Sequence, residues 1–212
     1  MCVHFQTQGR DVFPGQSASI WLKGPLKDQR VWARFGLIPS WAKDESLARH
    51  TLNARSESVA EKPSFRGPWR LGQRCVVPIS TFFEPCWESG HAVRWGMRAV
   101  PPEEELLAAG LWDSWQPPAS HSEGHPERPA EATLSFTILT INADNHPLMR
   151  RMHRPGDEKR MPVLLRPDQV ETWLNLPAHA SDTSRALFNN TFDLRGEPMP
   201  LPNQIDINLS LF

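Results

Sequence analysis

The chain has 212 residues, a net charge of −1 and a pI near 6.7. These values exclude a protein that holds nucleic acid through overall positive charge, so any basic surface for DNA must be local. The length and a hydrophobic content of 39% fit a single domain over 1–212 with a substantial core. No apolar run approaches the roughly eighteen residues of a membrane span. Three cysteines form no disulfide framework, which favours a reducing, cytoplasmic location.

The first elements are predicted to be short strands. Residues 3–30 contain Gly and Pro punctuation between short apolar pieces, which indicates an extended arm with one or two strands. The next segment, 31–41, is apolar and is broken by Gly36 and Pro39. We expect a strand here that runs into a rigid turn and presents Trp41.

The middle of the chain is predicted to contain a helix and a buried strand. Segment 46–61, which includes Asn53, lacks Gly and Pro and has a loosely helical apolar period. Segment 74–86 is rich in β-branched and aromatic residues, so we expect a single buried strand that reaches Glu84. The apolar pieces 95–100 and 106–112 are predicted to form a hairpin after it.

The second half begins with a polar insertion. Segment 116–131 is rich in Pro, Ser and Glu, which predicts a flexible insertion between strands. Segment 134–141 (LSFTILTI) is the clearest strand in the chain, and 161–165 predicts another. A short helix should follow, because Pro167 suits a first helical position and Val170, Trp173 and Leu174 share one apolar face.

Four polar residues are candidates for chemistry: Cys2, Asn53, Glu84 and His153. A carboxylate beside aromatic residues, such as Glu84, has its pKa raised by desolvation and suits general acid–base catalysis. A histidine exchanges protons near pH 7, and an asparagine amide orients a substrate oxygen. Each residue type alone is more often structural.

Cys2 follows only the initiator methionine. Removal of Met1 would leave a thiol and an α-amine on adjacent carbons, with ordinary pKa values of about 8.5 and about 7.7–8.0. This pair can condense with an aldehyde to close a five-membered thiazolidine ring. The spacing of Cys75 and Cys86 is not that of a zinc pair, so we expect neither a metal nor a cofactor.

Taken in order, the motifs resemble the SRAP (SOS-response-associated peptidase) family of abasic-site-processing proteins. Six blocks carry the resemblance: Met1-Cys2; RFGLIPSWA at 34–42; NARSE at 53–57; RCVVPISTFFE at 74–84; AGLW at 109–112; and Met152-His153 with EKRMPVLL at 158–165. The chain departs from the family at Val3 and His4, where Gly and Arg are usual. It also has Phe35 in place of a tryptophan, and Pro85-Cys86 after the glutamate.

The resemblance implies an α+β fold, with two packed, partly barrel-like β-sheets of mixed or antiparallel strands and a few peripheral helices. It also implies a covalent thiazolidine link between Cys2 and an abasic site in single-stranded DNA. By the same resemblance Glu84 is the acid/base and the residue linked to N-terminal autoprocessing. Asn53 positions the sugar, and His153, preferred over His146, assists proton transfer.

The resemblance further implies which residues contact DNA: Arg34, Pro39, Ser40, Trp41, Arg55 and Arg150. The protein is expected to be a monomer, to have no membrane partner and to lie in the cytoplasm near the nucleoid. Two alternatives stay open from the residues. One is an N-terminal-nucleophile cysteine amidohydrolase that turns over a small amide. The other is a single-stranded DNA-binding module that forms no cross-link.

Overall fold

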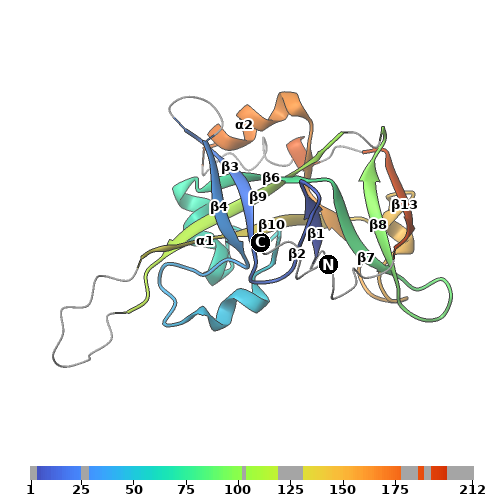
Figure 1. Cartoon of the computed structure of the whole chain (residues 1–212), viewed down its shortest axis with the longest axis horizontal. Coiled ribbons are helices and arrows are strands. Elements are labelled where there is room, and N and C mark those ends of the chain that lie inside the picture. The colour runs from blue at the N-terminus through green and yellow to red at the C-terminus, as the bar shows by residue number, and fades with distance from the viewer. Residues whose placement is uncertain are drawn as a thin grey trace.

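The computed structural model describes residues 4–24, 29–101, 104–118, 131–177, 186–188 and 192–199. Thirteen strands and the helices α1 and α2 lie in these ranges, residues 186–188 are also helical, and three short 3₁₀ turns occur at Glu45–His50, Met149–Arg151 and Pro167–Gln169. The strands form two sheets, which Figure 1 shows side by side, with β3, β4 and β9 on the left and β7, β8 and β13 on the right. The fold is α+β, as predicted.

The larger sheet closes on itself. It contains β3 (Ser17–Leu22), β4 (Gln29–Phe35), β6 (Arg74–Ile79), β9 (Leu106–Trp115) and β10 (Thr133–Asn142). Each of these strands pairs with the next around the ring in the order β10-β4-β3-β6-β9, and β9 pairs again with β10. Only the β4–β10 contact is parallel. Closure removes the sheet edges that would otherwise be left unpaired, so this five-stranded barrel is the rigid part of the fold.

Short strands extend the barrel at its rim. β5 (Asn53–Arg55) lies parallel to β10, β11 (Arg160–Pro162) lies antiparallel to it, and β12 (Leu164–Leu165) pairs with β9. β5 and β11 therefore flank the same strand, although about a hundred residues separate them in the sequence.

The second sheet is antiparallel and has five strands in the order β13-β8-β7-β1-β2. Its members are β1 (Phe5–Thr7), β2 (Arg10–Val12), β7 (Thr81–Cys86), β8 (Val93–Ala99) and β13 (Leu194–Pro198). The chain leaves the barrel at the end of β6 and enters this sheet after Ser80, whose N–H donates to the Gln6 carbonyl. The first strand is thus held directly beside β7.

Side chains of the barrel strands point alternately to the inside and the outside of the barrel, which creates two hydrophobic cores. On β6, Cys75, Val77 and Ile79 join the cluster inside the barrel, whereas Val76 joins a second cluster outside it. Successive side chains of a strand point to opposite faces, so every residue of β6 is buried. The outer cluster is covered by α1 (Pro63–Leu71) and α2 (Val170–Asn175) through Trp69 and Trp173.

One glycine fixes the turn after β4. Gly36 has φ +109°, and a Cβ there would lie 2.5 Å from the Ala48 carbonyl oxygen. Only glycine fits this backbone and this space. The turn carries the chain to an exposed Trp41, as predicted.

Five local predictions are wrong. Residues 3–30 hold three complete strands, β1 to β3, rather than one or two, and 161–165 is divided between β11 and β12, which pair with different strands. Segment 46–61 is not a helix beyond the 3₁₀ turn Glu45–His50, because its NAR residues pair with β10 as strand β5. Segment 74–86 is two strands in different sheets rather than one. The pieces 95–100 and 106–112 are not a hairpin, since β8 pairs with β7 and β9 pairs with β6. In each case long-range pairing overrides the local pattern.

Other predictions hold. β10 covers 134–141, and α2 buries Val170, Trp173 and Leu174 after Pro167. Most of the polar insertion 116–131 lies outside the described residues. Among the helices that the structure describes, none is long and apolar enough to cross a membrane.

Candidate active site around Glu84 and His153

The structure brings Glu84 and His153 together from distant parts of the chain. Glu84 lies on β7 with its side chain 1% exposed, and its Oε2 is 3.5 Å from Nδ1 of His153. Two backbone contacts hold Met152 and His153, here called the histidine segment, against β7. An isolated bridge joins Cys86 to Met152, and the His153 N–H donates to the Pro85 carbonyl at 2.7 Å. The pair is therefore positioned by the sheet.

The backbone of His153 is strained. Its φ is +62°, a left-handed value that side chains other than glycine rarely adopt. Such conformations persist only where surrounding contacts enforce them, and they gather at functional sites. Here the hydrogen bond to Pro85 enforces it on the main chain. A second bond fixes the ring, since Nε2 lies 3.0 Å from the Arg160 carbonyl oxygen.

These contacts define the proton positions of the pair. A carbonyl oxygen only accepts, so Nε2 of His153 donates to Arg160 and a neutral ring presents an unprotonated Nδ1 to Glu84. Burial raises the pKa of Glu84 to about 7. Burial also lowers the pKa of His153 from its ordinary value, partly offset by the bond to Arg160. At neutral pH the two groups are thus suited to take up and release a proton.

Asn53 stands on β5, opposite Ile138 of β10. Together with Arg55 it lines a surface pocket of about 290 Å³. Two further basic side chains, His50 and Lys62, line the same pocket, as do the small polar residues Thr51, Ser58 and Ser64. Leu47, Pro63 and Phe65 complete the lining, so the pocket combines apolar surface with an amide, hydroxyls and three basic groups.

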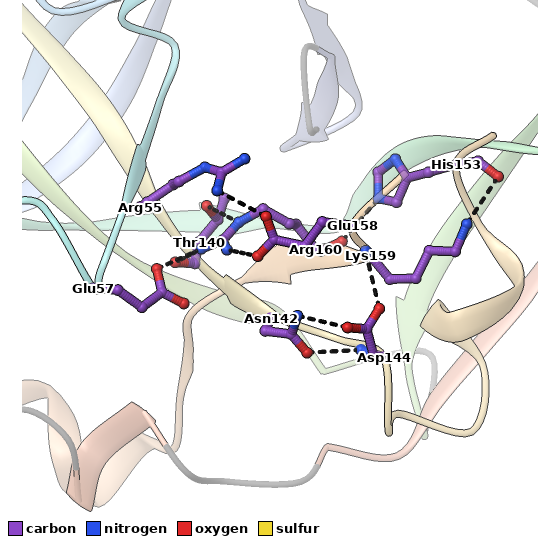
Figure 2. A network of polar contacts seen from close by, with 9 residues as sticks. All are labelled: Arg55, Glu57, Thr140, Asn142, Asp144, His153, Glu158, Lys159 and Arg160. Carbon is purple, nitrogen blue, oxygen red and sulfur yellow. Dashed lines mark hydrogen bonds and ion pairs between the residues drawn. The ribbon is translucent and has the colours of Figure 1, made fainter. Parts of the chain in front are cut away.

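The buried guanidinium of Arg160 lies between β10 and two carboxylates, Glu57 and Glu158 (Figure 2). The guanidinium of Arg160 donates to the Thr140 carbonyl and hydroxyl of β10 at 2.7 and 3.1 Å. It also bonds Glu57 at 2.8 Å and Glu158 at 2.5 Å. Because the carbonyl of the same residue holds the His153 ring, Arg160 links that ring to β10 and to Glu57, which follows β5.

Cys2 lies outside the described residues. The described chain begins at His4, whose carbonyl accepts a hydrogen bond from the N–H of Phe83 at 3.2 Å. Phe83 immediately precedes Glu84. The start of β1 is thereby fixed to β7 at the position of the buried carboxyl.

His4 is itself firmly held. Its ring stacks between Phe13 and Phe83, with centroids 4.0 and 4.4 Å away. Arg94 lies 3.0 Å from Nδ1 and can only donate, so Nε2 carries the proton that bonds Asp11. Burial lowers the pKa of His4, although Asp11 acts to raise it. His4 therefore serves as a neutral anchor for the N-terminal strand.

The loop predicted to contact DNA has mixed exposure. Trp41 is 59% exposed, and Ser40 is exposed while its N–H donates to Asp113 at 2.9 Å. Pro39 is buried, so it supports the loop rather than projecting from it. Arg34, on β4, forms an ion pair with Glu45.

The other two predicted DNA contacts lie elsewhere on the surface. The Arg55 side chain is 53% exposed, and its NH1 pairs with Glu158 at 2.7 Å. Arg150 is exposed on the 3₁₀ turn Met149–Arg151. In the sequence, Arg150 follows His146 by four residues.

His146 has a structural environment. Its Nδ1 accepts from the backbone N–H groups of Leu148 and Met149 at 3.2 and 3.1 Å. Its Nε2 donates to the Phe192 carbonyl at 3.2 Å. Both ring nitrogens are occupied by main chain, whereas His153 faces Glu84. The geometry therefore favours His153 as the site histidine.

Sequence reasoning missed Arg160, Thr140, Asp11 and Arg94 as parts of the site. One signal was available, because Glu57 and the charged run 158–160 fall inside motif blocks. A buried arginine needs carboxylate partners, but no sequence pattern shows which carboxylates reach it. Within the described ranges, no cluster of three or more His, Cys, Asp or Glu side chains could hold a metal ion.

Comparison with known proteins gives a consistent result. The family model for SOS response associated peptidase (SRAP) matches residues 4–201. "Abasic site processing protein YoqW" of Bacillus subtilis is 36% identical over 144 residues, covering 67% of this chain and 55% of that protein. "Abasic site processing protein HMCES" of Gallus gallus is 29% identical over 163 residues, covering 67% of this chain and 44% of that protein.

The fold comparison agrees. A crystal structure of a protein from Bordetella bronchiseptica superposes with a TM-score of 0.78 at 28% identity, covering 94% of this chain and all of that one. A second, from Bacteroides thetaiotaomicron, has a TM-score of 0.71 at 25% identity, covering 90% and 77%. This chain spans about half the length of the curated relatives it matches. With a family model that matches nearly the whole chain, this protein belongs to the SRAP (SOS response associated peptidase) family.

Proposed function

We propose that the protein processes abasic sites in single-stranded DNA by forming a covalent thiazolidine link through Cys2. Membership of the SRAP family and relatives named for abasic-site processing support this function. The observation that carries it is the buried Glu84–His153 pair, placed beside the first strand of the chain. In the sequence, Cys2 precedes His4 by only two residues, and the His4 carbonyl bonds to Phe83, the neighbour of Glu84.

The chemistry requires three steps. First, the cyclic hemiacetal of the abasic deoxyribose opens to its aldehyde as a proton moves from the anomeric hydroxyl to the ring oxygen. Second, the α-amine of Cys2 adds to the aldehyde carbon and water leaves, which gives a Schiff base. Third, the Cys2 sulfur adds to that carbon while the nitrogen takes up the thiol proton. Thiol, amine and aldehyde thus give the ring and one water, with no change of oxidation state.

The site residues supply the proton transfers. A carboxyl with a pKa of about 7 is present in both protonation states at neutral pH, so Glu84 can protonate the departing oxygen and accept a proton from the amine. His153 holds its Nδ1 toward Glu84 and assists at the ring-opening hydroxyl. Asn53 orients the sugar without changing its own charge.

The same carboxyl serves a second, preparatory reaction. Ring closure needs the Cys2 amine, so Met1 must first be removed. Glu84 would act as the base that activates water for hydrolysis of the Met1–Cys2 peptide bond, which is the peptidase activity of the family name. We propose this autoprocessing for the same site because one buried, titratable carboxyl suits both proton transfers.

The DNA strand is proposed to contact Arg55, Trp41 and Ser40, with Arg34 and Arg150 as further phosphate contacts and Pro39 as support. The lining of the pocket beside Asn53 is compatible with the sugar–phosphate backbone. The chain has no overall positive charge, so local phosphate contacts would supply the binding before the covalent step. The affinity at this stage should therefore fall as the salt concentration rises.

Incubation with single-stranded DNA that carries one abasic site tests the function. We expect a complex that survives denaturing electrophoresis, and we expect Cys2→Ala to abolish it. Cys86→Ala is the matched control, since Cys86 is a buried thiol on β7 and its removal should leave the complex intact. Turnover of a small amide without any DNA adduct would identify the amidohydrolase alternative. Binding without a denaturant-resistant complex would identify a simple binding module.

A further inference from the structure

The outer surface of β3 and β4 carries an unusual set of side chains. The two strands are antiparallel, with Trp21 opposite Arg30 and Ser19 opposite Trp32. Ala18, Ile20 and Leu22 alternate with these residues and fill the barrel. Because side chains alternate along a strand, Trp21, Arg30 and Trp32 share the face that points away from the barrel interior.

Trp32 is not explained by packing. Its side chain is 58% exposed, and it lies outside the three hydrophobic clusters of the described residues. Trp21 differs, because it is partly buried against the outer cluster. Tryptophan is enriched at binding interfaces, because its ring is apolar and its N–H can bond to a partner. Among the described residues, the side chains that stack on the tryptophan rings of this surface are arginines.

Each of these tryptophans has an arginine over its ring. The guanidinium carbon of Arg10, on β2, lies 5.5 Å from the ring centroid of Trp32. That of Arg30 lies 5.4 Å from the centroid of Trp21. Among the described residues, no carboxylate lies within ion-pair distance of Arg10 or Arg30, so their charges face solvent. We call Arg10, Trp21, Arg30 and Trp32 the arginine–tryptophan ribbon.

Basic residues outnumber acidic ones in the segment that forms this surface. Between residues 12 and 43 the sequence holds five Lys or Arg and a single Asp, although the whole chain has a net charge of −1. This local excess of basic residues favours a polyanion, although Arg34 is already paired with Glu45. Along β4, Arg30 and Trp32 are spaced at the two-residue strand repeat of about 6.8 Å.

We propose that the arginine–tryptophan ribbon is a binding track for undamaged single-stranded DNA that flanks the processed nucleotide. Bases would stack on Trp32, and the guanidinium groups of Arg10 and Arg30 would bind phosphates. Exposed aromatic rings interleaved with arginines bind single strands without sequence preference, because every base has a flat face and every linkage a negative charge. The proposal deepens the proposed function, since it assigns a second contact region to the same strand.

A protein partner fits this surface less well. Centres of protein interfaces are depleted of charge, whereas here an unneutralised arginine covers each tryptophan. A second copy of the chain would bring its own arginines against these arginines. Like charges would then face one another, which opposes association.

The test compares the affinities of full-length variants for undamaged oligo-dT of about 4 and about 16 nucleotides, lengths that span the usual site sizes of small β-barrels. We expect Trp32→Ala to weaken binding of the long oligonucleotide about tenfold and to leave the short one nearly unchanged. Trp32→Phe should restore most of the loss. Arg30→Ala should reduce the slope of log affinity against log salt by about 1. Leu71→Ala, at a 77% exposed apolar position on α1, is the matched control and should bind like the parent protein.

The outcomes separate the two proposals. Unchanged affinity of Trp32→Ala for the long oligonucleotide, at unchanged thermal stability, would overturn the ribbon. Equal losses for both lengths would also overturn it, because the effect would then not be a flanking contact. A change in oligomeric state without a change in DNA affinity would assign the face to self-association instead. Cross-linking to a short abasic oligonucleotide reports on Cys2 alone, so its absence would refute the proposed function while leaving the length test readable.

Discussion

Two buried polar residues, Glu84 and Arg160, contact opposite nitrogens of the His153 ring and behave differently. Glu84 is enclosed by β7 and the histidine segment, and its burial raises its pKa to about 7. Arg160 is equally buried, but its guanidinium meets Glu57 and Glu158, whose side chains are 53% and 35% exposed. Burial acts to raise the pKa of Glu158, yet Arg160 and Arg55 hold it below its ordinary value.

The difference shows how one fold separates chemistry from support. A buried carboxyl whose pKa is set by desolvation changes protonation near neutral pH. A buried guanidinium between carboxylates stays charged and fixes geometry. The Arg160 carbonyl then transmits that geometry to the His153 ring.

The largest expected effect is that of Glu84→Gln. The amide keeps the shape of the side chain but cannot exchange protons, so the rate of cross-linking should fall by about 10²- to 10⁴-fold. The wild-type rate should vary with pH around 7, and this dependence should be absent in the variant. Single-turnover assays on denaturing gels at several pH values measure both. A loss smaller than tenfold would remove Glu84 from the proton-transfer role.

The two histidines give a matched pair for the next test. His153→Ala should slow cross-linking by about a hundredfold, because it removes the group facing Glu84. His146→Ala should leave the rate almost unchanged. It should instead lower the free energy of unfolding by about 1–2 kcal/mol, because two backbone N–H groups lose their acceptor. The reverse pattern would assign the chemistry to His146.

Arg160→Met tests the supporting cluster. The buried Thr140 carbonyl and hydroxyl would lose their donor, which should reduce the free energy of unfolding by about 1–3 kcal/mol in urea titrations. Arg166→Met is the control, because the Arg166–Asp168 pair is exposed and worth less than about 1 kcal/mol. Equal losses in the two variants would show that Arg160 has no special supporting role.

Stability should depend on pH with a sign set by Glu84. Its folded-state pKa lies above that of the unfolded chain, so the folded state binds more protons between those values. The Glu84 contribution is therefore present below the unfolded pKa and is lost as pH rises toward about 7. Glu84→Gln should flatten this part of the curve. Glu88, whose pKa is lowered by its bond to Arg151, has the opposite sign, because its contribution is present above the unfolded pKa and is lost as pH falls. Glu88→Gln should therefore lower stability slightly at neutral pH and have no effect at low pH.

The smallest effect is expected for Arg55→Met. The Arg55–Glu158 pair is exposed, so its loss should change the free energy of unfolding by less than about 1 kcal/mol. Affinity for single-stranded DNA should fall, and the salt slope should decrease by about 1, if Arg55 binds a phosphate. Titrations at several salt concentrations give the slope. An unchanged slope would place Arg55 in the supporting cluster only.

Much of the fold could be read from local patterns, but the pairing of the strands could not. The run 134–141 and the helix after Pro167 were predictable because their apolar periods are local. The strand identity of Asn53 was not, since β5 has only three residues and exists through its bonds to β10. The break at Ser80, which moves the chain between sheets, also leaves no local mark.

By itself, the sequence determined the candidate residues and their order in the motif blocks. It nominated Asn53, Glu84 and His153 as candidates, and it placed Trp41 on a presented turn. Only the tertiary structure decided that His153 rather than His146 faces Glu84, and that Arg160 contacts both the His153 ring and Glu57. The physical reason is that side-chain identity and short-range period are local properties. Proximity between β7, β10 and β11 depends instead on hydrogen bonds between segments far apart in the chain.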